Sequence, residues 1–161
     1  MRYAENTTIS SDKSRAEIEK LVAKYGASKF AYAWEDAHDP GAEAAGRAQI
    51  QFVLANRHIR FLLPMPSRND KSITHTASRK WQRSDAEQER AYEQAVRQRW
   101  RALALVIKAK LEAVAAGITE FESEFLANIV MPDNRTVAEH VRPQIERAYI
   151  DGKVPAMLTQ F

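Results

Sequence analysis

The longest stretch of the chain without glycine or proline runs from Asp85 to Ala116, and it constrains the fold more than any other segment. At about 100° per residue, its large apolar side chains fall on one arc of a helix. These side chains are Tyr92, Val96, Trp100, Leu103, Ile107, Leu111 and Val114. The pattern predicts one long amphipathic helix that covers a core and ends at Gly117.

Two further strips run along the same predicted helix. The first is made of small residues: Ala91, Ala95, Ala102, Ala109 and Ala113. It would let another helix approach closely, from this chain or from a partner, but it also fits the plain helix preference of alanine. The second is basic: Arg90, Arg97, Arg101 and Lys108. It fits either a solvated face or an anionic partner, and the i,i+4 repulsion between Arg97 and Arg101 favours the partner.

The residues before the long helix predict one helix and three strands. Ser14 and Glu17 have capping-box spacing, which predicts a first helix over about residues 12–25. Large and small side chains alternate in the segment "SKFAYAWE", as in a strand with one bulky face. The segments "QIQFVL" and "HIRFLL" alternate in the same way, and they predict a hairpin that turns at Asn56-Arg57.

The remaining segments are less regular. Residues 67–84 have no clean period and predict a long basic loop before the helix. Two pairs with capping-box spacing, Thr119 with Glu122 and Thr136 with Glu139, predict two short helices near the end. Residues 1–9 are expected to fray, and residues 153–161 form a tail that would dock by its large apolar side chains. These are Met157, Leu158 and Phe161.

Together these elements predict an α+β fold in a single domain over residues 1–161. An N-terminal helix precedes a small three-stranded antiparallel sheet, one long helix packs on it, and two short helices follow. No apolar run reaches the roughly 18 residues of a membrane span, and the first residues do not resemble a secretory signal. The absence of cysteine suits a cytoplasmic location and excludes disulfides and thiolate metal sites.

Charge is distributed unevenly along the chain. Residues 57–110 contain 13 basic and 5 acidic residues, a net of +8, whereas the remainder contains 11 and 16, a net of −5. Such asymmetry suggests an anionic partner for the basic part.

Catalytic signatures are weak by comparison. The four histidines lack paired ligand spacing, and the five glycines are scattered singly, so no phosphate-binding loop is present. Acidic residues at positions 120, 122 and 124 could bind a metal but more often oppose a helix dipole. We therefore expect a protein that is not an enzyme and has no cofactor and no metal.

Three segments resemble a family of small proteins from bacteriophages and prophages: "MRYAENTTISSDKSRAEIEK", "FLLPMPSR" and "AYEQAVRQRWRALALVIKAKLEAV". The resemblance covers nearly the whole chain, and it implies a phage product in the bacterial cytoplasm, with no assigned activity. The predicted order of elements also resembles double-stranded-RNA-binding domains and phage single-strand annealing proteins. The late position of "KAK" in the long helix and the long preceding loop depart from the RNA-binding pattern.

The leading hypothesis is nucleic-acid binding, with single-stranded DNA preferred, in phage replication or recombination. Lysines and arginines of the basic region would neutralise phosphates, and Trp81 would stack on a base. The expected binding residues are Arg68, Lys71, Arg79, Lys80, Trp81, Arg83, Arg90, Arg97, Arg101 and Lys108. The alternative is a non-enzymatic phage protein that docks on an acidic host protein, inhibits it, and self-associates through the alanine strip as a homo-oligomer.

Overall fold

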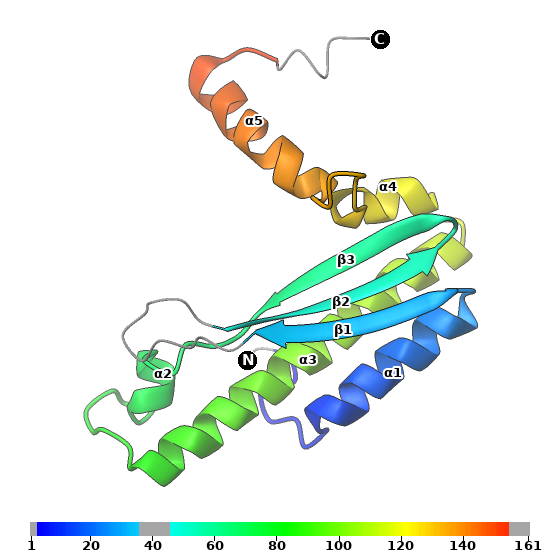
Figure 1. Ribbon diagram of the computed structural model, residues 1–161. Helices are drawn as coiled ribbons and strands as arrows, with labels where there is room; N and C mark the ends of the chain where they lie inside the picture. Colours follow the sequence, from blue (N-terminus) through cyan, green and yellow to red (C-terminus); the bar gives the residue numbers. More distant parts are fainter. Residues whose placement is uncertain (1–2, 36–45, 155–161) are drawn as a thin grey trace.

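The computed structural model describes residues 3–35 and 46–154 (Figure 1). It confirms the predicted order of an N-terminal helix, a three-stranded antiparallel sheet, a long helix and shorter C-terminal helices. The elements are α1 (Ser11–Lys24), β1 (Lys29–Glu35), β2 (Arg47–Leu54), β3 (Arg57–Pro64), α2 (Lys71–Thr74), α3 (Asp85–Ala115), α4 (Phe121–Phe125), the 3-10 helix η1 (Leu126–Asn128) and α5 (Val137–Asp151).

The sheet has the order β1-β2-β3 and buries one face. Its antiparallel register aligns Tyr32 with Ile50 and Ile50 with Phe61, so these three side chains, one from each strand, share that face. Helices α1 and α3 cover it, and Ile18 and Ile107 are fully buried in the same core. The alternation in the sequence therefore predicts the buried face correctly, and the opposite face remains uncovered by either helix.

The start of α1 differs from the prediction. Ser10, rather than Ser14, is the N-cap, and its hydroxyl accepts a hydrogen bond from the Lys13 backbone N–H at 3.2 Å. Ser14 lies inside the helix and is fully buried. Two serines separated by one turn offer similar caps, and the choice follows from packing, because Ser14 lies on the same face as Ile18 and Val22.

The turn between β2 and β3 is shifted by one residue from the prediction. Leu54 pairs with Arg57, so the two turn residues are Ala55 and Asn56 rather than Asn56 and Arg57. Both have left-handed backbone angles, with φ of 50° at Ala55 and 59° at Asn56, as a type I′ hairpin requires. The shift keeps Ile59 and Phe61 on the buried face, since a slip of one residue would turn them to solvent.

Substitution Ala55→Gly is expected to stabilise the protein by about 1 kcal/mol. A left-handed backbone costs a non-glycine residue roughly 1–2 kcal/mol, and the extra entropy that glycine loses on folding offsets part of that gain. The thermal midpoint should rise by about 2–4 °C in a chain of this size. Ala77→Gly is the control, because Ala77 is also exposed but is not among the residues with positive φ. An equal rise of the thermal midpoint in both variants would contradict the explanation by backbone strain at Ala55.

The first described residues lie along α3 instead of fraying. The Gln94 side-chain amide donates to the backbone oxygens of Glu5 and Thr7, both at 3.0 Å. One turn later the Gln98 amide donates to the Tyr3 oxygen at 3.1 Å. Two glutamines at i,i+4 spacing therefore hold this segment. The docking predicted for Met157, Leu158 and Phe161 falls outside the described residues.

The C-terminal helices attach at the β3 edge of the sheet. The predicted cap at Thr119 is wrong, because Glu120 is the N-cap of α4 and forms no side-chain capping bond. The predicted capping box of Thr136 with Glu139 is confirmed at the start of α5. An isolated bridge between Ile59 and Ile129 joins this region to β3. Beyond it, α5 runs away from the sheet and from the other helices (Figure 1).

Candidate nucleic-acid interface

Residues 67–84, expected as a loop, contain α2 and a tight hairpin. We call residues 74–83 the basic hairpin. The Thr76 N–H donates to the Trp81 oxygen at 2.9 Å, and the Arg83 N–H donates to the Thr74 oxygen at 2.8 Å. At the turn, the Arg79 N–H donates to the Thr76 oxygen at 2.7 Å. These hydrogen bonds give the segment an ordered hairpin conformation, which its irregular sequence does not predict.

Arg83 fixes the base of the basic hairpin. Its Nη1 donates to the backbone oxygens of Ser72 at 2.6 Å and Ile73 at 3.0 Å, near the carboxyl end of α2. Ile73 is buried, and α2 packs against α3. The cation therefore satisfies carbonyls that a helix end leaves without partners. Arg83 therefore has a structural role, because its guanidinium is engaged by backbone oxygens and is not available to bind a ligand in this arrangement.

The tip of the basic hairpin presents three side chains to solvent. Trp81 is 73 % exposed, and Arg79 and Lys80 are exposed beside it. No described residue forms a hydrogen bond or ion pair with the Arg79 or Lys80 side chain. Arg79 has a φ of 57°, so the backbone is in the left-handed region where the chain reverses. An exposed tryptophan that directly follows two exposed cations, on a hydrogen-bonded turn, forms a compact, positively charged contact surface.

The basic strip on α3 is largely engaged with the protein itself. Arg101 pairs with Glu17 of α1, and this partner raises the pKa of Arg101. The Arg97 guanidinium donates to Gln94 Oε1 at 2.6 and 3.1 Å and lies 3.8 Å from a Glu93 oxygen. The basic strip is therefore not wholly available to an anionic partner, since Arg101 joins α1 to α3 and Arg97 bonds within α3.

The other predicted binding residues divide in the same way. Arg68 forms an ion pair with Glu89, whose pKa it lowers by hydrogen bonding, and it lies 3.9 Å from the ring centroid of Tyr92. Three cations are exposed, and no described residue forms an ion pair or hydrogen bond with their side chains: Lys71, Arg90 and Lys108. The structure thus places Arg79, Lys80 and Trp81 in one hairpin tip. A binding role for Lys71, Arg90 and Lys108 stays a prediction.

Charge reversal at Arg101 is expected to destabilise the fold. Arg101→Glu would remove the pair with Glu17 and place two carboxylates face to face, at a cost of about 1–2 kcal/mol for a partly exposed site. Urea denaturation should show this loss, and the swap Glu17→Arg with Arg101→Glu should restore most of it. Lys108→Glu, on the same strip, should leave stability nearly unchanged. Equal losses at Lys108 and Arg101 would contradict the structural role of the pair.

A second basic surface, absent from the predicted site, lies on the uncovered face of the sheet. The register aligns Lys29 with Val53 and Val53 with His58 in one row, and Gln51 with Arg60 in the next. The His58 Nε2 lies 2.7 Å from Gln51 Oε1. Burial, followed by the nearby Arg60 and Lys29, lowers the pKa of His58, which favours its neutral form. The alternation of the strands predicts that Gln51, His58 and Arg60 share one face, and the register confirms it.

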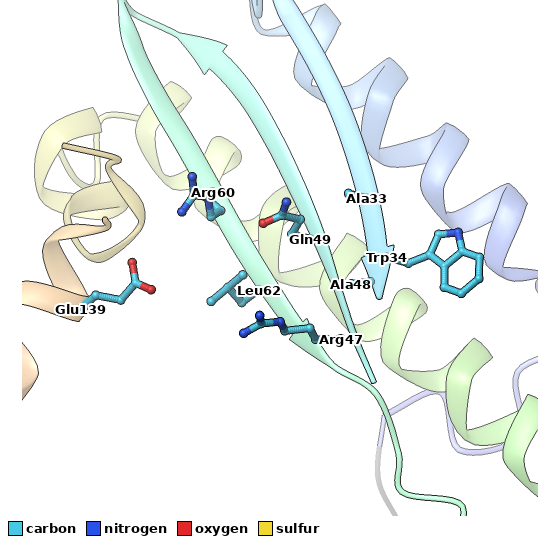
Figure 2. A pocket seen from close by; sticks show the side chains of 8 residues that line it. All are labelled: Ala33, Trp34, Arg47, Ala48, Gln49, Arg60, Leu62 and Glu139. Atoms are coloured by element: carbon cyan, nitrogen blue, oxygen red, sulfur yellow. The ribbon is translucent and has the colours of Figure 1, made fainter. Parts of the chain in front are cut away.

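A pocket of about 370 Å³ lies where this sheet face approaches α5, and Figure 2 shows the side chains that line it. Arg47, Leu62 and Arg60 reach from the strands toward Glu139, whereas Trp34 points away from the pocket. Arg60 Nη1 donates to the Asn134 backbone oxygen at 2.9 Å. Glu139 accepts a hydrogen bond from the Thr136 backbone N–H at 2.6 Å, which is the first cause of its lowered pKa. The pocket therefore lies where β3 contacts the segment that leads into α5, and its polar side chains hold these two parts of the fold together.

Within residues 3–35 and 46–154, no group of three or more metal-ligating side chains is arranged to hold a metal ion. None of the helices in this part of the chain is long and apolar enough to cross a membrane. No family model, curated protein or solved structure matches the chain.

Proposed function

We propose that the protein binds nucleic acid through the tip of the basic hairpin, with single-stranded DNA as the preferred ligand. The observation that carries this proposal is the exposure of Trp81 directly after Arg79 and Lys80 on a hydrogen-bonded turn. The two cations would neutralise neighbouring phosphates, and the indole would stack on a base. The phage resemblance of the sequence supports a role in replication or recombination.

The preference for single strands follows from the chemistry of the tip. An indole ring gains about 1–3 kcal/mol by stacking on a base, but the bases of a duplex already stack on one another. Arg79 and Lys80 contact phosphates in either ligand, so they supply affinity without this preference. Trp81 should therefore distinguish single-stranded from double-stranded DNA.

Fluorescence anisotropy with labelled oligo(dT) and with a duplex of the same length, over a salt series, tests the proposal. Trp81→Ala should weaken binding to oligo(dT) by about tenfold or more and weaken duplex binding less. Trp34→Ala is the matched control, because Trp34 is 69 % exposed but lies on β1, outside the basic hairpin. Failure of the folded protein to bind either ligand at low salt, or equal losses in both variants, would overturn the proposal.

A further inference from the structure

Helix α5 has an apolar side that nothing in the described chain covers. None of its residues is buried, and Tyr149 and Ile150 are 88 % and 83 % exposed. Ile145 lies one turn before Tyr149 and is 46 % exposed. A helix of 15 residues is marginal in water without tertiary contacts, and Pro143 inside it removes a further backbone hydrogen bond. Packing against another surface would bury these apolar side chains and so stabilise α5.

The base of α5 is nevertheless firmly attached. The Val137 N–H donates to the Ile129 oxygen at 2.9 Å, and the capping box of Thr136 with Glu139 closes the first turn. His140 Nε2 lies 2.9 Å from an Asp133 oxygen. These contacts fix the direction in which the helix leaves the body, so α5 is presented as an arm instead of folding back (Figure 1).

The surface that suits this arm lies on the side of α3 that faces away from the sheet. We call it the α3 stripe, and it consists of Ala102, Leu105, Val106, Ala109 and Ala113. On a helix these positions lie opposite the buried side chains of Trp100, Ile107 and Leu111. Leu105 and Val106 are 42 % and 44 % exposed, and the stripe contains no charged residue.

Neighbouring helices border the α3 stripe without covering it. On one flank, the Tyr25 hydroxyl of α1 donates to a Glu112 carboxylate oxygen at 2.6 Å. On the other flank, Lys110 Nζ lies 3.0 Å from a Glu124 oxygen of α4. Between these contacts the α3 stripe consists of three alanines together with Leu105 and Val106. A helix with bulky side chains can approach such a surface closely.

The arm cannot reach this stripe within its own chain. It leaves from η1 at the β3 edge and runs away from the sheet (Figure 1), whereas the stripe lies on α3 opposite the residues that this helix buries. We propose that α5 of one copy packs on the α3 stripe of a second copy. The occupant is fixed by complementarity, because one surface of the chain carries bulky exposed side chains and the other small ones.

Length and charge agree with this pairing. The 15 residues of α5 span about 22 Å, and the stripe from Ala102 to Ala113 spans about 18 Å. Between positions 99 and 113, α3 carries four basic residues and one acidic residue, whereas α5 carries three acidic and two basic ones. Because the arm and the stripe are different surfaces, the contact is either exchanged reciprocally in a two-fold dimer or repeated from copy to copy in a ring or an open filament.

Sedimentation velocity on the full chain, at several protein concentrations and after nuclease treatment, tests this association. The wild type should form species larger than a monomer. Ile145→Asp with Tyr149→Asp in the arm, and Ala109→Arg in the stripe, should each give monomers with unchanged circular dichroism and thermal midpoint. Ile118→Asp is the matched control, because Ile118 is 80 % exposed and lies outside both surfaces. It should associate as the wild type does.

Mixing the arm variant with the stripe variant distinguishes this contact from other ways to dimerise. The arm of the Ala109→Arg variant is intact, and so is the stripe of the Ile145→Asp, Tyr149→Asp variant, so the mixture should form a one-to-one dimer joined by a single arm-on-stripe contact. A symmetric contact between two α5 helices would instead leave the Ala109→Arg variant associated and the mixture without a heterodimer. Either of those results, or a wild type that is monomeric throughout, would overturn the proposal.

Discussion

Reversing the charge of Arg79 and Lys80 together is expected to weaken binding to single-stranded DNA by on the order of 100-fold at low salt. Each substitution to glutamate would replace an attraction to phosphate by a repulsion. Both side chains are exposed, and no described residue pairs with either, so the fold should remain intact. The loss would therefore be one of affinity alone, visible in an anisotropy titration with unchanged thermal unfolding.

The salt dependence gives an independent reading of the same change. Each phosphate neutralised on a single strand contributes about 0.7 to the slope of log K against log salt, so the double variant should lower the slope by about 1.4. Lys13→Glu with Lys20→Glu on α1 is the control, since both lysines are exposed and distant in sequence from the basic hairpin. If this control loses as much affinity, binding depends on overall charge and the hairpin is not the contact surface.

Substitution Phe125→Ala is expected to cost about 3–5 kcal/mol of stability, more than any other change considered for this protein. Phe125 is fully buried, and its ring centroid lies 4.9 Å from that of Phe121 and 6.3 Å from that of Phe61. The ring also lies edge-on to Phe52, at 6.4 Å. Removing it would leave a cavity where the sheet, α3 and α4 meet.

Urea unfolding measures this loss, and the thermal midpoint should fall by roughly 10 °C. Leu126→Ala is the neighbouring control, because Leu126 is 52 % exposed and should change stability by less than about 1 kcal/mol. A small effect at Phe125 would mean that α4 and the C-terminal region contribute little to the core, and that the fold rests on α1, α3 and the sheet alone.

Much of the architecture could be predicted because hydrophobic periodicity is a strong local signal. The stripe that contains Trp100, Ile107 and Leu111 predicts α3, and the alternation in the strands predicts the buried sheet face. The errors concern single positions that tertiary contacts decide. The cap at Ser10 and the turn at Ala55-Asn56 depend on which side chains reach the core, and local spacing alone does not fix them.

The candidate site was less predictable because ion pairs join residues that are far apart in sequence. Nothing near Arg101 indicates that Glu17, 84 positions earlier, will pair with it. The sequence likewise predicts Arg83 as a ligand-binding cation, although it donates hydrogen bonds to backbone oxygens of α2. Counting basic residues identifies a region rich in positive charge, but only the fold separates cations that hold the protein together from those that remain available, such as Lys80.

The hydrogen bonds within the basic hairpin have a thermodynamic consequence for any ligand. Because the turn at Arg79 is already formed and Arg83 anchors its base, contact need not order a loose segment first. Binding then avoids the entropic penalty of coupled folding, and calorimetry should give a small change in heat capacity. A preformed contact of this kind therefore turns more of its interaction energy with a ligand into affinity.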